Sequence, residues 1–106
     1  MKFEMNGRTY IIKEVSQEVL QQEHGEIDGT FFGLTIPMKQ EILIWEDLLK
    51  EQKRKTLYHE LFHCYTCNYL TFNPIEFSED AWADVSANSH DIIHKIVEDY
   101  FNTQKN

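Results

Sequence analysis

The chain has 106 residues, of which 42% are hydrophobic, enough for a single domain over residues 1–106 with one modest core. Its 18 acidic residues outnumber 10 basic ones, and the resulting net charge of −8 argues against nucleic acid as a partner because phosphates would be repelled. Charged residues interrupt every hydrophobic run, so no segment resembles a signal peptide or a membrane span of about 20 residues, and we expect a cytoplasmic protein without a membrane partner.

The first 25 residues predict a hairpin followed by a short helix. Asn6-Gly7, a dipeptide that tolerates the positive φ angles of a type I′ turn, separates short alternating segments. We therefore expect strands near 2–5 and 8–13. Ser16 is suited to cap the start of a helix and Gly25 to end it.

The middle of the chain predicts a second hairpin and then a long helix. The runs 30–36 and 41–45 are rich in residues that favour strands, and Pro37 to Gln40 would form the turn between them. From about Leu48 to Leu70 neither Gly nor Pro intervenes, and good helix formers dominate. A loop containing Asn73-Pro74 would end this helix.

The last segment, from Ser78 to about Phe101, predicts an amphipathic helix. At 100° per residue its apolar side chains share one broad face, made of Trp82, Val85, Ile92, Ile93, Ile96, Val97 and Tyr100. The sequence therefore predicts an α+β fold, in which a small sheet of two hairpins packs on the long helix and on this C-terminal, acid-bearing helix.

The stretch "YHELFH", inside the long helix, predicts a metal site. Residues i and i+4 project from one helix face, so His59 and His63 can direct imidazole nitrogens at one zinc ion. Glu60 is rotated by about 100°, out of reach of the ion but close enough to act as a general base on a metal-bound water. The alternative is a pair of ordinary histidines without a ligand.

A catalytic zinc takes three protein ligands, so a third one is needed. The candidates are Glu76, Glu79, Asp80, His90 and His94. Glu79 projects beside Trp82 on the inward side of the C-terminal helix, where an unpaired carboxylate is costly and a metal would explain it. Asp80 falls on the outward acidic stripe, although both acids also suit the first turn of a helix.

Three other patterns leave alternatives open. Asp80 with Asp84 has an i, i+4 spacing that would suit a ligand and its supporting residue. "HDIIH", from His90 to His94, repeats the histidine spacing and is a weaker candidate for a second metal site. Cys64 and Cys67 lie three apart without a second pair, which favours reduced, packed thiols over a zinc knuckle or a disulfide.

The stretches "TLYHELFH" and "FSEDAWADVSA" resemble the gluzincin metallopeptidases, in particular small phage- and mobile-element-encoded proteins of the ImmA/IrrE type. The resemblance covers residue 29 to the C-terminus. It implies one zinc ion held by His59, His63 and Glu79, with Glu60 as general base.

The chain departs from the gluzincin pattern at two points. Many gluzincins carry Asp or Asn four residues after the ligand Glu, where this chain has Ala83, so a partner that orients the ligand histidines must come from elsewhere. Larger relatives also use a Tyr or His to stabilise the oxyanion. The sequence does not identify that residue here, and His90 and Tyr69 are guesses for it.

The sequence thus predicts a zinc-dependent endopeptidase that acts on a protein or peptide, by family analogy a regulatory protein such as a phage or element repressor. The alternative is a non-catalytic, zinc-stabilised interaction module. A DNA-associated protease with a third ligand histidine is disfavoured by the acidic composition and by the position of His90, about 16 Å along the helix from Glu79.

Overall fold

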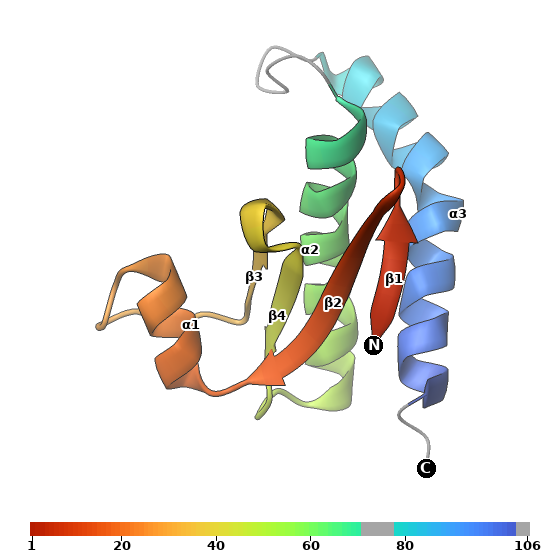
Figure 1. Ribbon diagram of the computed structural model, residues 1–106. Coiled ribbons are helices and arrows are strands. Elements are labelled where there is room, and N and C mark those ends of the chain that lie inside the picture. Colours follow the sequence, from red (N-terminus) through yellow and green to blue (C-terminus); the bar gives the residue numbers. More distant parts are fainter. Residues whose placement is uncertain (71–77, 104–106) are drawn as a thin grey trace.

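The computed structural model describes residues 1–70 and 78–103 and confirms an α+β fold (Figure 1). The loop with Asn73-Pro74 and the candidate ligand Glu76 lie outside the described residues. In chain order the elements are β1 (Lys2–Met5), β2 (Arg8–Val15), α1 (Gln17–His24), β3 (Gly33–Ile36), the short 3₁₀ turn η1 (Pro37–Lys39), β4 (Glu41–Trp45), α2 (Lys50–Tyr69) and α3 (Glu79–Thr103).

Both predicted hairpins are present, and together they form one four-stranded sheet in the order β1-β2-β4-β3. The turn between β1 and β2 has positive φ at Asn6 (52°) and Gly7 (77°), as a type I′ turn requires. β3 and β4 pair antiparallel, whereas β2 and β4 pair parallel and join the two hairpins. β3 therefore forms one edge of the sheet.

α1 has the predicted ends. The Ser16 hydroxyl accepts a hydrogen bond from the Val19 N–H at 3.3 Å, and Gly25 ends the helix at φ 78°. Leu20 of α1 and Leu43 of β4 are buried but stand outside the main core cluster. Since Leu43 alternates with the core residues Ile42 and Ile44, it faces the opposite side of the sheet.

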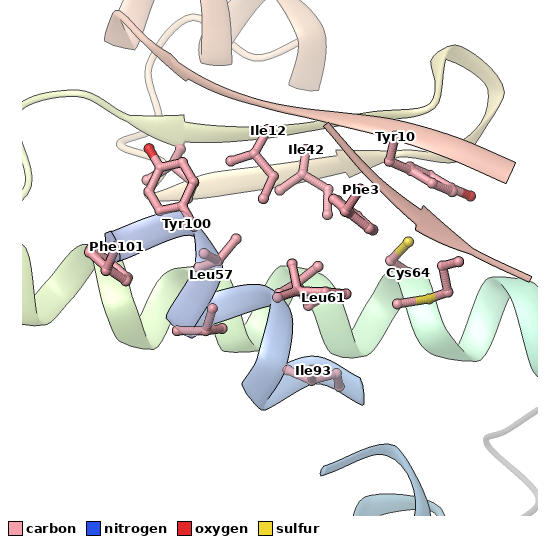
Figure 2. Packing of buried hydrophobic residues seen from close by; sticks show 14 of the residues in the cluster. Phe3, Tyr10, Ile12, Ile42, Leu57, Leu61, Cys64, Ile93, Tyr100 and Phe101 are labelled. Atoms are coloured by element: carbon pink, nitrogen blue, oxygen red, sulfur yellow. The ribbon is translucent and has the colours of Figure 1, made fainter. Parts of the chain in front are cut away.

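The main core lies between the sheet and the two long helices. Figure 2 shows Phe3, Ile12 and Ile42 of the sheet directed toward Leu57 and Leu61 of α2. α3 adds Ile93, Ile96, Val97, Tyr100 and Phe101 to the same cluster. Burial of these side chains fixes α2 against the sheet and α3 against α2, which positions the HExxH segment of α2.

The predicted apolar face of α3 is largely confirmed, with one residue wrongly included and one omitted. Ile92, predicted to face inward, is 39% exposed, whereas Phe101 is buried and belongs to the core. Trp82 and Val85 are half-buried. Within residues 1–70 and 78–103 neither α2, α3 nor any shorter helix is long and apolar enough to cross a membrane.

A polar cluster ties β2 to both long helices. Glu14 of β2 accepts hydrogen bonds from the Lys53 ammonium at 2.6 Å and from the Tyr100 hydroxyl. Burial acts to raise the pKa of the Glu14 carboxyl, but the bonds from Lys53 and Tyr100 outweigh burial and leave the pKa below its ordinary value. The same burial and the bond to Glu14 raise the pKa of Tyr100.

Candidate metal centre

His59 and His63 project from one face of α2 as the spacing predicts. Both side chains are exposed, and their Nε2 atoms lie 3.2 Å apart with the ring planes at 75°. Two imidazole nitrogens at this distance need either a shared proton or a shared cation between them. The two nitrogens therefore converge as the donors of a metal ion would.

The geometry of this pair fits zinc. Zn–N bonds of about 2.0–2.1 Å at a tetrahedral angle place two ligand nitrogens about 3.3 Å apart. The observed 3.2 Å agrees with that separation. His59 and His63 thus match two of the ligands that a zinc ion would use.

Glu60 is positioned differently from its two neighbours. Its side chain is only 7% exposed, because α2 turns it toward the sheet. The Thr35 hydroxyl lies 2.9 Å from the Glu60 carboxylate oxygen Oε1 and 2.9 Å from the Glu60 backbone carbonyl oxygen. A buried carboxylate is costly without a donor, so Thr35 both stabilises Glu60 and fixes its orientation.

Gly33 permits the close approach of β3 to Glu60. A Cβ atom at Gly33 would lie 2.8 Å from Thr56 Cγ2, 2.9 Å from the Leu43 carbonyl oxygen and 3.2 Å from Glu60 Cγ. Gly33 and Thr35 are two apart on β3 and so face the same side, toward α2. Neither residue was predicted as part of the site, although their i, i+2 spacing within the predicted strand 30–36 places both on one face.

Three cavities meet at His59. The first, about 360 Å³, lies between α2 and α3 and is called the interhelical cavity below; His59, His63 and His90 are among its lining residues. The other two, about 370 and 430 Å³, flank β3 and share Gly33, His59 and Glu60 in their linings. The histidine pair thus borders cavities on both the sheet edge and the helix interface, whereas Glu60 borders only the two cavities beside β3.

The open edge of β3 carries backbone groups beside these cavities. The Phe32 carbonyl accepts a hydrogen bond from the Trp45 N–H at 2.8 Å. Along an antiparallel strand, residues whose N–H and carbonyl bond to the partner strand alternate with residues whose N–H and carbonyl point away from it. Since Phe32 bonds to β4, the N–H and carbonyl groups of Gly33 and Thr35 point away from β4. The Gly33 carbonyl meets His24 Nε2 at 3.3 Å, and Thr35 lines one of the two cavities.

The predicted third ligand, Glu79, does not have the buried position that the helical projection gave it. Glu79, predicted to project inward, is exposed, as is its neighbour Asp80. A buried carboxylate in need of a metal is therefore not present at Glu79. Among the described residues no three His, Cys, Asp or Glu side chains are close enough together to hold a metal ion.

α3 brings other histidines to the site. His90 is exposed and lines the interhelical cavity with His59 and His63. The His90 and His94 rings are stacked, with centroids 5.5 Å apart and planes at 15°, so they do not converge as the α2 pair does. His94 Nδ1 lies 2.6 Å from the Tyr58 hydroxyl.

Tyr69, a guess for the oxyanion-stabilising residue, lies away from the three cavities. Tyr69 packs against Tyr65, with ring centroids 4.8 Å apart, and is not among the residues that line the three cavities.

Both cysteines are free thiols, as expected, but only Cys64 is buried. Burial raises the pKa of the Cys64 thiol to about 11. Cys67 is exposed and lines one of the cavities beside β3.

Comparison with protein-family models, with curated proteins and with solved structures found no match.

Proposed function

We propose that the protein is a zinc-dependent endopeptidase that cuts a protein or peptide substrate. The observation that supports this most is the convergent His59–His63 pair with a buried, hydrogen-bonded Glu60 on the same helix. A site that only stabilises the fold has no use for a base held beside its ligands.

The chain itself supplies binding and proton transfer. A bound zinc ion would supply Lewis acidity at His59 and His63. Glu60 removes a proton from the attacking water and delivers it to the leaving nitrogen, while the Thr35 hydroxyl keeps the carboxylate in place. The outward backbone groups of Thr35 on β3 would pair with an extended substrate, since the Gly33 carbonyl already contacts His24.

Glu79 is the proposed third ligand, and His90 is its competitor. Glu79 lies three residues before Trp82, whose ring packs on Phe62 of α2 at 5.8 Å, so its helix stripe faces α2. His90 instead shares the interhelical cavity with the pair. To bind a zinc ion held by His59 and His63, the Glu79 carboxylate would have to move from its exposed position toward α2.

A zinc titration of single variants distinguishes these candidates. Glu79→Gln should weaken zinc binding by about tenfold or more, whereas Asp80→Asn should leave it nearly unchanged. Loss of zinc in His90→Asn with retention in Glu79→Gln would instead assign the third ligand to His90. Loss in Asp80→Asn alone would support the pairing of Asp80 with Asp84.

We propose in addition that the protein is a gluzincin-like enzyme and that it works in the cytoplasm. The resemblance of "TLYHELFH" and "FSEDAWADVSA" supports a gluzincin-like enzyme of the ImmA/IrrE type from a phage or mobile element, with a regulatory protein as substrate. Two free thiols in the described part of the chain agree with the reducing conditions of the cytoplasm.

The activity is tested with zinc-loaded protein and a digest of whole-proteome peptides, with cleavage read by mass spectrometry. Wild type should cut the peptides, and Glu60→Gln should keep zinc but lose about 100-fold or more of the rate. Glu51→Gln, an exposed position in the first turn of α2, is the matched control. Zinc binding by wild type without any cleavage would favour the non-catalytic interaction module.

A further inference from the structure

The interhelical cavity lies directly beside the proposed metal ligands. It occupies about 360 Å³ between α2 and α3, and His59 and His63 form part of its wall. A cavity of about 150 Å³ is enough to hold benzene. We infer that this cavity receives a bulky apolar side chain, aromatic by preference, of the substrate residue next to the cut bond; this inference rests on the proposed function.

Six of the eight residues that line the cavity in the described part of the chain are aromatic or apolar, if its three histidines are counted as aromatic, and the other two are serines. Ile93 of α3 is 4% exposed, and Phe62 of α2 packs against the Trp82 ring. Of the described residues that line the cavity, none is Asp, Glu, Lys or Arg. A cationic substrate side chain would therefore lose its hydration without gaining a carboxylate partner, whereas an aromatic ring would be buried against Tyr58, Phe62 and Ile93.

Two small residues of α3 leave the space open. Ser86 and Ser89 line the cavity where a larger side chain would fill it. Ser89 is 1% exposed, and its hydroxyl donates a hydrogen bond to the Ser86 carbonyl at 3.2 Å. Because that hydroxyl is already bonded within the helix, the cavity can accept an apolar group without leaving the Ser89 donor unpaired.

The aromatic wall at Tyr58 is held in place before any ligand binds. Its hydroxyl is bonded to His94 Nδ1 of α3, and the Arg54 guanidinium lies 5.7 Å from the ring centroid. Arg54 is itself paired with Glu98 of α3. A wall fixed from both helices needs little ordering when a ring enters, which favours binding.

The test uses two hydroxamates that differ only in the apolar group that would enter the cavity. 3-Phenylpropanohydroxamic acid carries a phenyl ring and acetohydroxamic acid does not, and both are titrated calorimetrically into zinc-loaded protein of measured metal content. Wild type should bind the phenyl probe about tenfold or more tightly than the small one. Ser86→Phe, which fills the cavity from an exposed helix position, should reduce that preference to below about threefold.

Ala87→Phe is the matched control, since Ala87 is exposed on the same helix and does not line the cavity; it should keep the wild-type preference. Equal binding of both probes by wild type, or the same preference in Ser86→Phe, would overturn the inference and leave the proposed zinc site intact. A protein that takes up no zinc would overturn the proposed function and the inference with it.

Discussion

Removal of the Thr35 hydroxyl perturbs the proposed catalytic base without changing the shape of the site. Thr35→Val replaces the hydroxyl with a methyl group of similar size and leaves the 7% exposed Glu60 carboxylate without its donor at 2.9 Å. The single hydroxyl proton is shared between the Glu60 carboxylate and the Glu60 backbone carbonyl, so the free energy of unfolding should fall by about 1.5 kcal/mol, the lower end for a hydrogen bond to a charged group. Because Glu60 would lose its fixed orientation, peptide cleavage should also slow by about tenfold or more.

Urea denaturation followed by circular dichroism measures the first effect, and cleavage of the peptide digest measures the second. Thr35→Ser is the control, because it keeps the hydroxyl and loses only a methyl group of a half-buried side chain. Thr35→Ser should stay closer to wild type than Thr35→Val in both assays. If the two variants were equally destabilised and equally slow, the hydroxyl would have no role in holding Glu60.

Three other perturbations test the surroundings of the site. Gly33→Ala should lower the free energy of unfolding by about 1–3 kcal/mol, since the new methyl group would lie 2.9 Å from the immovable Leu43 carbonyl; an unchanged urea midpoint would contradict the close packing of β3 on α2. Iodoacetamide should modify Cys67 in the native protein and spare Cys64, whose pKa is raised by burial; peptide mapping that finds Cys64 labelled first would show that the burial is wrong. Glu14→Gln should cost about 1 kcal/mol at neutral pH. Because the folded protein holds the pKa of Glu14 below its ordinary value, that difference should persist above the ordinary pKa and vanish as the pH falls through the lowered one; a difference that grows in acid would contradict this.

The local structure near the N-terminus could be predicted because single residues determine it. Asn6-Gly7 adopts the positive φ angles that only a few residue types tolerate, and Ser16 and Gly25 cap α1 at both ends. The parallel pairing of β2 with β4 could not be predicted, because it joins segments about 30 residues apart and no local pattern specifies it.

The helical projection of α3 identified most of the α3 residues that are buried in the core, but it was wrong at the borders of the surface that α3 packs against. Ile92 lies on the predicted apolar arc and yet is exposed, while Phe101 is buried beside Tyr100 in the core. A projection assumes one flat partner surface, whereas α3 contacts a core of finite width. The same limit explains why Glu79, on the predicted inner face, is exposed at the start of the helix.

The HExxH spacing was sufficient to predict the convergence of His59 and His63, because i and i+4 share a helix face. The support for Glu60 was not predicted. Thr35 and Gly33 reach it from a strand about 25 residues earlier, and only the register between β3 and β4 turns them toward α2. Which residue completes the metal site stays a prediction.

The most direct test of the central claim is zinc binding by the histidine pair, measured by competition with a chromophoric chelator. Wild type should bind one zinc ion per chain, and a His59→Ala/His63→Ala double variant that keeps the wild-type circular dichroism spectrum should bind none. A His90→Asn/His94→Gln double variant tests the stacked pair of α3 in the same titration and should still bind zinc if Glu79 is the third ligand. Absence of zinc uptake by wild type, or equal uptake by the His59→Ala/His63→Ala variant, would contradict the account.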